Sequence, residues 1–490
     1  MRNPLSSFRI KFSATYAFWI AALAPPGIAL FLGTTEQDLG EELLALIVTA
    51  AAVFALVTYR GRRLAGWARA IVTWLVRHRR PPDVPSTPVV GATVRPGDRV
   101  ALRWEGRWLV AVVKVNPRPL APTLVVDGRA DTNDFLDTAL LEHLLEVNCP
   151  DLQAEVVSAG YRVGRSAPRE VVSIYARLIG RDPAPAYRRT WITLRADPRA
   201  AQRSALRRDT DVAGLARYLV ASSTRIADQL AAHGVDATCE SDFGDYDAAT
   251  TISFKVERWS SIKGHGTYTA AYTAPGGPDA WWSAPARRTI TRFRVAAGEP
   301  PRSAVFLTTA TKPKRPAGFS RASGGQRDPL AAAILTTDRH RELPIGSAGI
   351  LVGETANRER LYLPFDAGDA SVTVGDARMF TQFAVRAAAA GATVTLPTEF
   401  GDLASRIGGD AGPEAKVTWP DATTYLGPQP GLMSVVVQEN VVSVPGNTLF
   451  RIEPVSSDAE ARYQQALPGK SRTNGATRAT NGKTRARQSG

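Results

Sequence analysis

Two long apolar segments near the start of the chain constrain its fold more than any other feature. Residues 14–32 contain no charged side chain, and neither do residues 43–59. Each segment approaches the roughly 20 residues that a helix needs to cross the apolar core of a bilayer. A cleaved signal peptide is one alternative, but its apolar core is shorter and is not followed by a second segment. A pair of buried helices in a soluble protein is the other.

The charges around these segments predict how they lie in a membrane. The loop between them holds four acidic residues and no lysine or arginine, whereas seven arginines follow within residues 60–80. Because lysine and arginine stay on the cytoplasmic side, the sequence predicts a transmembrane hairpin over residues 1–63. The protein would then cross the inner (cytoplasmic) membrane twice, with both termini cytoplasmic. The same asymmetry argues against a pair of soluble helices.

Both predicted membrane helices have the composition of helices that pack against other helices. The first carries two adjacent prolines near its middle, and proline kinks a helix. The second is rich in alanine, and small residues let helix backbones approach closely within a bilayer. The residues predicted to make these helix contacts are Ala17, Ala21, Pro25, Pro26, Ala45 and Ala52.

Residues 64–90 predict a juxtamembrane helix followed by a proline-containing linker. Aromatic and aliphatic residues recur there at helical spacing among arginines, which is typical of helices that lie on anionic lipid. A solvated continuation of the second membrane helix is the alternative. The residues predicted to contact the membrane surface are Arg60, Arg62, Arg63, Trp67, Trp74, Arg77, Arg79 and Arg80.

The net charge of +14 does not indicate a nucleic-acid-binding protein. The excess lies at the two ends of the chain, because residues 91–467 carry 44 basic and 41 acidic side chains. Such a nearly neutral body offers no surface that could follow a phosphate backbone. The tail, 468–490, has six basic residues, no acidic residue and almost no apolar residue, so it is predicted to be disordered.

Residues 91–467 predict a cytosolic, mixed α/β body. A hairpin is expected over 100–115, and a helix over 134–146 has Asp131 as its expected N-cap. Strands that alternate with helices up to residue 233 imply a mostly parallel sheet covered on both faces. The body is either one large domain or two lobes, about 91–260 and 261–467.

The sequence predicts no catalytic, metal or cofactor site and no small-molecule substrate. Asp209-Thr210-Asp211 matches the Asp-x-Asp pattern that binds a divalent cation with a sugar nucleotide, because paired carboxylates chelate such cations. The motif precedes a helix, however, where Asp211 serves more simply as an N-cap. The two cysteines and five histidines show no metal-binding spacing, and the chain has no glycine-rich phosphate loop.

Several stretches carry a resemblance to a known family. They are PVVGATVRPG at 88–97, PDLQAEVVSAGYRVG at 150–164, GLARYLVASSTRIAD at 214–228 and LPIGSAGILVGET at 343–355. With the hairpin and the α/β body, they resemble EccE, the E component of the mycobacterial type VII (ESX) secretion membrane complex. The resemblance is strongest to the members that serve the system exporting the early secreted antigenic target and related virulence substrates. It extends from residue 1 to about residue 467.

The resemblance implies a structural subunit rather than an enzyme. Its expected partners are the other ESX membrane components, EccB, the EccC ATPase and EccD, together with membrane lipid. It also implies a cytosolic body with the shape of a glycosyltransferase and no active site. The alternative hypothesis is a membrane-tethered, glycosyltransferase-like enzyme that uses Asp209 and Asp211.

Overall fold

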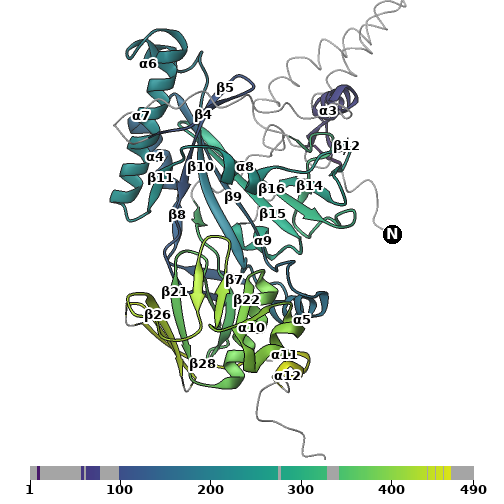
Figure 1. Cartoon of the computed structure of the whole chain (residues 1–490). Coiled ribbons are helices and arrows are strands. Elements are labelled where there is room, and N and C mark those ends of the chain that lie inside the picture. Colours follow the sequence, from purple (N-terminus) through teal and green to yellow (C-terminus); the bar gives the residue numbers. More distant parts are fainter. Residues whose placement is uncertain are drawn as a thin grey trace, which may run out of the picture. The chain divides into compact units, whose positions relative to one another are not determined.

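The computed structural model describes residues 8–10, 57–59, 62–77, 99–273, 277–327, 341–438, 440–446, 448–455 and 457–464 (Figure 1). Most of the predicted membrane hairpin lies outside these residues, as do its six predicted helix-packing residues and the tail, 468–490. Within the described ranges, no helix has both the length and the apolar character needed to cross a bilayer.

The chain divides into two compact units. Unit 1 comprises residues 1–163, 179–349 and 359–367, and unit 2 comprises residues 164–178, 350–358 and 368–490. The chain therefore passes between the units several times, whereas the two-lobe alternative from the sequence has a single boundary near residue 260.

Three short strands lie within the range of the predicted membrane hairpin. β1 (Phe8–Ile10) pairs antiparallel with β2 (Val57–Tyr59), which pairs in turn with β3 (Arg62–Arg63). Helix α3 (Leu64–Arg77) follows directly, as the helical spacing of this segment predicts. The prediction of a helix through residue 59 is wrong at its end, because the β-branched and aromatic residues of β2 form a strand there.

An 11-stranded sheet forms the framework of unit 1 (Figure 1). Its strand order is β11-β5-β10-β9-β15-β16-β14-β13-β12, with β4 beside β5 and β17 beside β14. The longest strands are β5 (Trp108–Val115), β9 (Leu152–Tyr161), β10 (Tyr187–Ala196), β15 (Arg288–Ala296) and β16 (Glu299–Thr309). The shorter ones are β4 (Leu102–Glu105), β11 (Ala237–Cys239), β12 (Val256–Arg258), β13 (Ser261–Lys263), β14 (Tyr268–Thr273) and β17 (Ser320–Arg321).

The strands of this sheet pair antiparallel, so the expectation of a mostly parallel sheet is wrong for unit 1. β9 and β10 are neighbours, and the helix between them in sequence, α5 (Arg169–Ile179), belongs almost entirely to unit 2. Parallel neighbours require a crossover, usually a helix that covers the sheet. α5 makes no such crossover, and β10 returns beside β9 in the opposite direction.

The two faces of the sheet bury different cores. On one face, α4 (Thr138–Asn148) contacts β9 and β15, and α7 (Asp211–Ala232) contacts β5 and β10 over the larger apolar cluster. On the other face, α8 (Gly244–Thr250) contacts β9 over a smaller cluster rich in aromatic rings. α6 (Gln202–Leu206) and α9 (Pro278–Ser283) are shorter helices of the same unit.

Two predicted helix starts in unit 1 need correction. α4 begins at Thr138 rather than Asp134, and its N-cap is Asp137, whose carboxylate accepts the Ala139 amide at 2.8 Å. The residues just before it form β8 (Phe135–Asp137), which pairs with β18 (Glu342–Pro344). The N-cap of α7 is Thr210, with Asp211 as the first helical residue. The remaining strands of unit 1, β20 (Arg360–Leu363), β6 (Thr123–Val126) and β7 (Arg129–Thr132), pair in that order.

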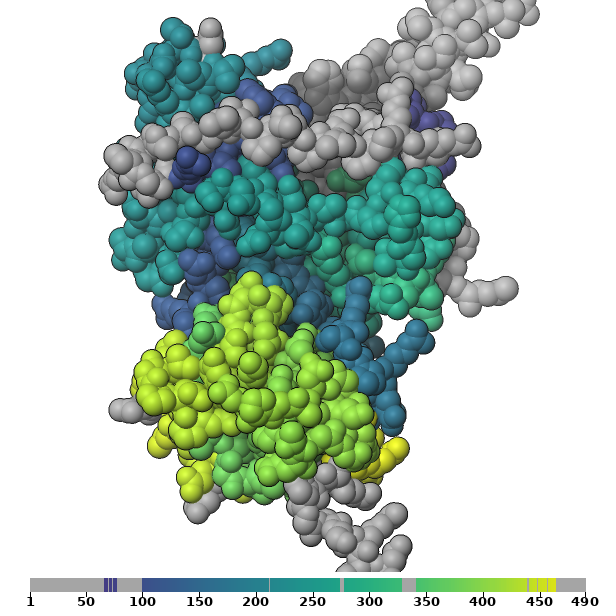
Figure 2. Space-filling view, in the orientation of Figure 1, coloured from purple at the N-terminus to yellow at the C-terminus, as the bar shows by residue number. Residues whose placement is uncertain are grey.

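Unit 2 contains a mixed sheet with the order β23-β22-β24-β25-β21-β26-β27-β28-β19. Figure 2 shows its surface in green to yellow, the colours of the C-terminal part of the chain. A strand–helix–strand segment consists of β21 (Ala370–Val374), α10 (Ala377–Ala390) and β22 (Thr393–Pro397), and α10 ends at Gly391 in the left-handed conformation. β26 (Met433–Gln438) and β27 (Val441–Val444) form a hairpin near the C-terminal end of the unit.

The other elements of unit 2 are short. They are β19 (Ile350–Thr355), β23 (Asp410–Gly412), β24 (Lys416–Thr418), β25 (Thr423–Tyr425), β28 (Thr448–Glu453), α11 (Gly401–Ile407) and α12 (Asp458–Gln464).

Candidate functional site

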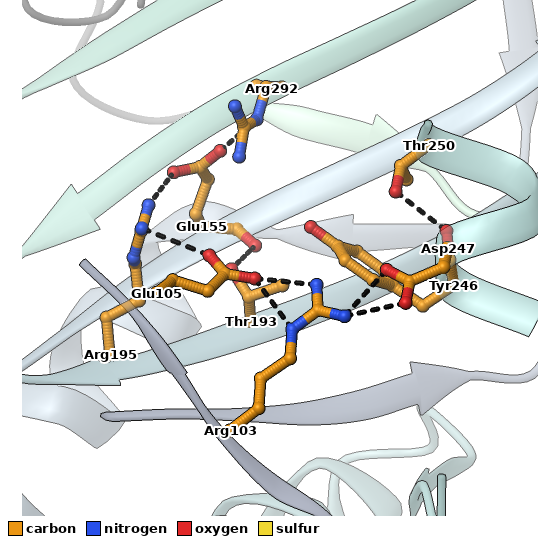
Figure 3. A network of polar contacts seen from close by, with 9 residues as sticks. All are labelled: Arg103, Glu105, Glu155, Thr193, Arg195, Tyr246, Asp247, Thr250 and Arg292. Atoms are coloured by element: carbon orange, nitrogen blue, oxygen red, sulfur yellow. Dashed lines mark hydrogen bonds and ion pairs between the residues drawn. The ribbon is translucent and has the colours of Figure 1, made fainter. Parts of the chain in front are cut away.

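A polar network in unit 1 surrounds Glu155, which has no exposed surface (Figure 3). This carboxylate lies in β9, between β10 and β15. Arg195 from β10 approaches it to 3.4 Å, Arg294 from β15 approaches it to 3.3 Å, and Arg292 from β15 also pairs with it. A single carboxylate thus joins three adjacent strands through three arginines.

The arginines decide the charge of Glu155. Burial acts to raise the pKa of this carboxyl, but the nearby charges of Arg292, Arg195 and Arg294 outweigh it, so the pKa lies below its ordinary value. Glu155 is therefore ionised at neutral pH. A group that holds no proton under these conditions cannot serve as a general acid, and its lone pairs are engaged by guanidinium groups.

The network continues toward β4 and α8. Arg195 also contacts Glu105 at 3.2 Å, and Glu105 binds Arg103 at 2.6 Å. Arg103 reaches Asp247 of α8 at 2.7 Å, and its guanidinium lies 4.0 Å from the centre of the Phe243 ring. Burial acts to lower the pKa of Arg103, but the hydrogen bonds to Asp247 and Glu105 raise it overall. The chain of ion pairs therefore links β15, β9, β10, β4 and α8.

A second buried cluster in unit 1 fixes the segment Gly346–Gly349, within one of the stretches that resemble EccE. The Arg189 guanidinium binds Asp366 at 2.7 Å, and the Ser347 hydroxyl donates to the same carboxylate at 2.7 Å. The Arg188 side chain donates to the carbonyl of Gly346 at 2.6 Å. These contacts give the Gly346–Gly349 segment a structural role.

Two ionisable groups of this cluster have shifted pKa values because they are buried. Burial lowers the pKa of Arg188 to about 10, although nearby carboxylates oppose the shift. Burial also raises the pKa of Asp134, which accepts the amide of Gly346 at 2.9 Å. At neutral pH the Arg188 charge remains, so the carboxylates around it serve as its counter-ions.

Of the two acidic side chains in the Asp-x-Asp motif, the structure describes that of Asp209. Asp209 binds Arg217 at 3.0 Å on the first turns of α7, and it accepts the Thr210 amide at 2.8 Å. In the parts of the chain that the structure describes, no group of three or more His, Cys, Asp or Glu side chains is placed to hold a metal ion. The Asp209 contacts lie at the start of α7, although the N-cap there is Thr210 rather than the predicted Asp211.

The predicted membrane-surface residues fall into two groups. Arg60, Arg79 and Arg80 lie outside the described residues. Arg62 and Arg63 belong to β3, and Trp67, Trp74 and Arg77 belong to α3. The structure brings Trp67 and Trp74 together on Trp259, with 5.8 Å between ring centres in each pair.

Sequence reasoning missed Glu155 and its arginines, although a signal is present. Glu155 stands alone in the otherwise uncharged strand β9, and Arg292 and Arg294 alternate with apolar residues in β15. A carboxylate inside a buried strand must find positive partners. That signal predicts a buried ion pair, but it does not say which arginines provide it.

The fold and these clusters define a mixed α/β protein whose buried charges pair with one another across strands. A sequence model of the family described as "Putative type VII ESX secretion system translocon, EccE" matches residues 184–274. The ESX-1 secretion system protein EccE1 of Mycobacterium tuberculosis is 58% identical over 468 residues, covering 96% of this chain and 100% of that protein. EccE1 of Mycolicibacterium smegmatis is 53% identical over 465 residues, covering 95% of this chain and 99% of that protein.

A more distant relative is the ESX-2 secretion system protein EccE2 of Mycobacterium tuberculosis. It is 25% identical over 411 residues, covering 75% of this chain and 72% of that protein. The chain belongs to the EccE family of type VII (ESX) secretion system proteins. This finding confirms the resemblance noted in the sequence, and it does not support the alternative enzyme hypothesis.

Proposed function

We propose that this protein is a structural membrane subunit of a type VII (ESX) secretion complex of the ESX-1 kind. The observation that carries the proposal is the near-complete coverage of proteins named as ESX-1 components, at 58% and 53% identity. In this proposal the transmembrane hairpin docks against helices of EccB, the EccC ATPase or EccD, and the body stabilises their cytosolic parts. The glycosyltransferase-like shape implied by the resemblance remains a prediction.

The strand pairing next to the apolar segments supports the two-pass topology. β1 precedes the first segment and β2 ends the second, and they pair in the register Phe8↔Tyr59 and Ile10↔Val57. The entry to the first segment and the exit from the second are thus held side by side. A hairpin that crosses a membrane twice has both ends on one side, which agrees with this pairing, and the arginines favour the cytoplasm as that side.

Co-purification of the complex tests the docking of the hairpin. Ala17→Trp and Ala21→Trp place a large ring on one helix face, and they are expected to reduce recovery of the partner subunits in mild detergent. Ala22→Trp, on a different face of the same helix, is the matched control and should leave recovery unchanged. Membrane extraction must show that all three variants still insert. Full recovery with Ala17→Trp and Ala21→Trp would refute this docking surface.

A further inference from the structure

Helix α3 presents two different apolar surfaces, and one of them contacts the body. On one surface, Trp67 stacks on Trp259 at an interplanar angle of 27°, and Trp74 meets the same ring edge-on at 90°. Trp259 lies in the turn between β12 and β13. Figures 1 and 2 show α3, in purple, at the edge of unit 1 that carries β12.

Gly324 makes this contact possible. Its backbone has a φ of 75°, and its amide donates to the carbonyl of Trp259 at 2.9 Å. A β-carbon at this position would lie 2.7 Å from the Trp259 ring and 3.1 Å from the β-carbon of Ala70. Any larger residue would therefore displace either the ring or the helix.

The loop that carries Gly324 is tied to the main sheet. The side chain of Gln326 is fully buried, and its carbonyl accepts the Ala271 amide of β14 at 2.8 Å. Its backbone amide donates to the buried carboxylate of Glu257 in β12 at 2.9 Å. We call Trp67, Ala70, Trp74, Trp259 and Gly324 the tryptophan clasp. These bonds connect the clasp to the sheet of unit 1.

The other apolar surface of α3 is largely exposed. Ile71, Val72, Leu75 and Val76 are exposed by 45%, 61%, 56% and 56%. Single exposed aliphatic residues are common, but several large ones together on one helix mark a surface that binds something apolar. The sequence predicted the tryptophans as the membrane contact, whereas the structure turns them toward the body and leaves these aliphatic side chains outside.

The position of α3 argues for lipid as the occupant of this surface. β2 contains the last residues of the second apolar segment, and β3 pairs with it in the register Tyr59↔Arg62 immediately before α3 begins. Four residues separate Tyr59 from Leu64, and a chain covers at most about 3.5 Å per residue. If the segment crosses the membrane as proposed above, α3 starts at the bilayer surface.

The charge of the surrounding sequence fits the same occupant. Seven arginines lie within residues 60–80, and residues 43–82 contain no acidic residue. Basic residues beside an amphipathic helix attract anionic headgroups while its aliphatic side chains enter the acyl boundary. We infer that Ile71, Val72, Leu75 and Val76 insert into an anionic lipid surface while the tryptophan clasp holds the body to the same helix. This inference rests on the proposed membrane hairpin.

Spin labels on the full chain in nanodiscs containing phosphatidylglycerol test the lipid contact. Labels at Val72→Cys and Val76→Cys, in a Cys239→Ser background, should be severalfold more accessible to oxygen than to a water-soluble nickel chelate. A label at the exposed Arg207 should show the opposite preference. Greater access to nickel at residues 72 and 76 would overturn the inference, and so would protection from both reagents, because the latter means that protein covers the surface.

A second measurement tests the clasp. The distance distribution between labels at residues 76 and 299, both in unit 1, should be narrow in the parent protein and broad in Gly324→Val. Gly325→Val is the matched control, because its added side chain would start in open space. Equal distributions in both variants would refute the clasp. Release of the protein from membranes by alkaline carbonate would instead refute the proposed hairpin, so the two failures are distinguishable.

Discussion

We expect Glu460→Gln to destabilise unit 2, because it breaks a buried ion pair that fastens α12 to α10. Arg386 and Glu460 form a two-pronged contact, at 2.8 Å through Nε and 3.0 Å through Nη2. Both side chains are only 2% exposed. Arg386 also donates to the carbonyl of Leu351 at 2.7 Å and to the carbonyl of Val455.

The structure sets the size of the effect. Removing one partner of a buried ion pair costs about 3–5 kcal/mol, because a charge stays buried without its counter-ion. Here Arg386 keeps two carbonyl acceptors, and the new glutamine offers a third. The cost should therefore fall near the lower limit, about 3 kcal/mol, which corresponds to roughly a 100-fold change in the opening equilibrium.

Native-state hydrogen exchange on the full chain measures this opening directly. Amides of α10 and β22 should exchange about 100-fold faster in Glu460→Gln than in the parent protein. Glu170→Gln is the control, because Glu170 and Arg462 form an ion pair of 3.9 Å with both side chains 66% exposed. Such surface pairs contribute about 0–1 kcal/mol. Similar acceleration in the two variants would refute the reasoning.

Three further predictions concern unit 1. The folded-state pKa of Glu155 lies below its ordinary value of 4.5, so its contribution to stability is complete above that pH and is lost as the pH falls through the folded pKa. In urea titrations, the free energy of unfolding should therefore fall less steeply toward acid pH in Glu155→Gln than in the parent protein. Parallel curves for the two proteins would contradict this. Burial raises the pKa of Cys149 to about 12, so iodoacetamide near pH 8 should modify only the partly exposed Cys239 until the protein unfolds, as peptide mass spectrometry will report. Gly349→Ala should lower the free energy of unfolding in urea by about 2–4 kcal/mol, because its β-carbon would lie 1.9 Å from the Leu363 carbonyl oxygen at a φ of 85°. Gly446→Ala, which has open space around the added β-carbon, should lower it by only about 1–2 kcal/mol.

Local patterns in the sequence predicted individual elements better than their arrangement. The buried residues Leu215, Leu219, Ile226 and Leu230 repeat at helical spacing along α7, and the hairpin of β4 and β5 flanks Gly106 as expected. Periodicity reports which side of an element is buried. It does not report which strand lies alongside, and the antiparallel pairing of β9 with β10 depends on where α5 goes.

The surface assignment of α3 shows a similar limit. Its spacing predicts a helix with apolar residues over a wide arc, but only the structure shows which part of that arc contacts the body. The body provides Trp259, which lies far along the chain, and a loop glycine that lets the ring approach. Only the folded sheet brings these groups to α3, so the sequence had no means of dividing the helix into a body side and an outer side.

The Glu155 network contributes to the register of the sheet rather than to its stability. Burying a carboxylate and three guanidinium groups brings little net stabilisation, because their desolvation offsets their attraction. A shift of one residue in the pairing of β9 would turn Glu155 toward the apolar cluster under α4 and α7, away from all three arginines. The unpaired charge would then be buried among aliphatic side chains, so the network penalises every odd shift in register. We therefore attribute to these charges the alignment of β10, β9 and β15, the strands on which both faces of unit 1 are built.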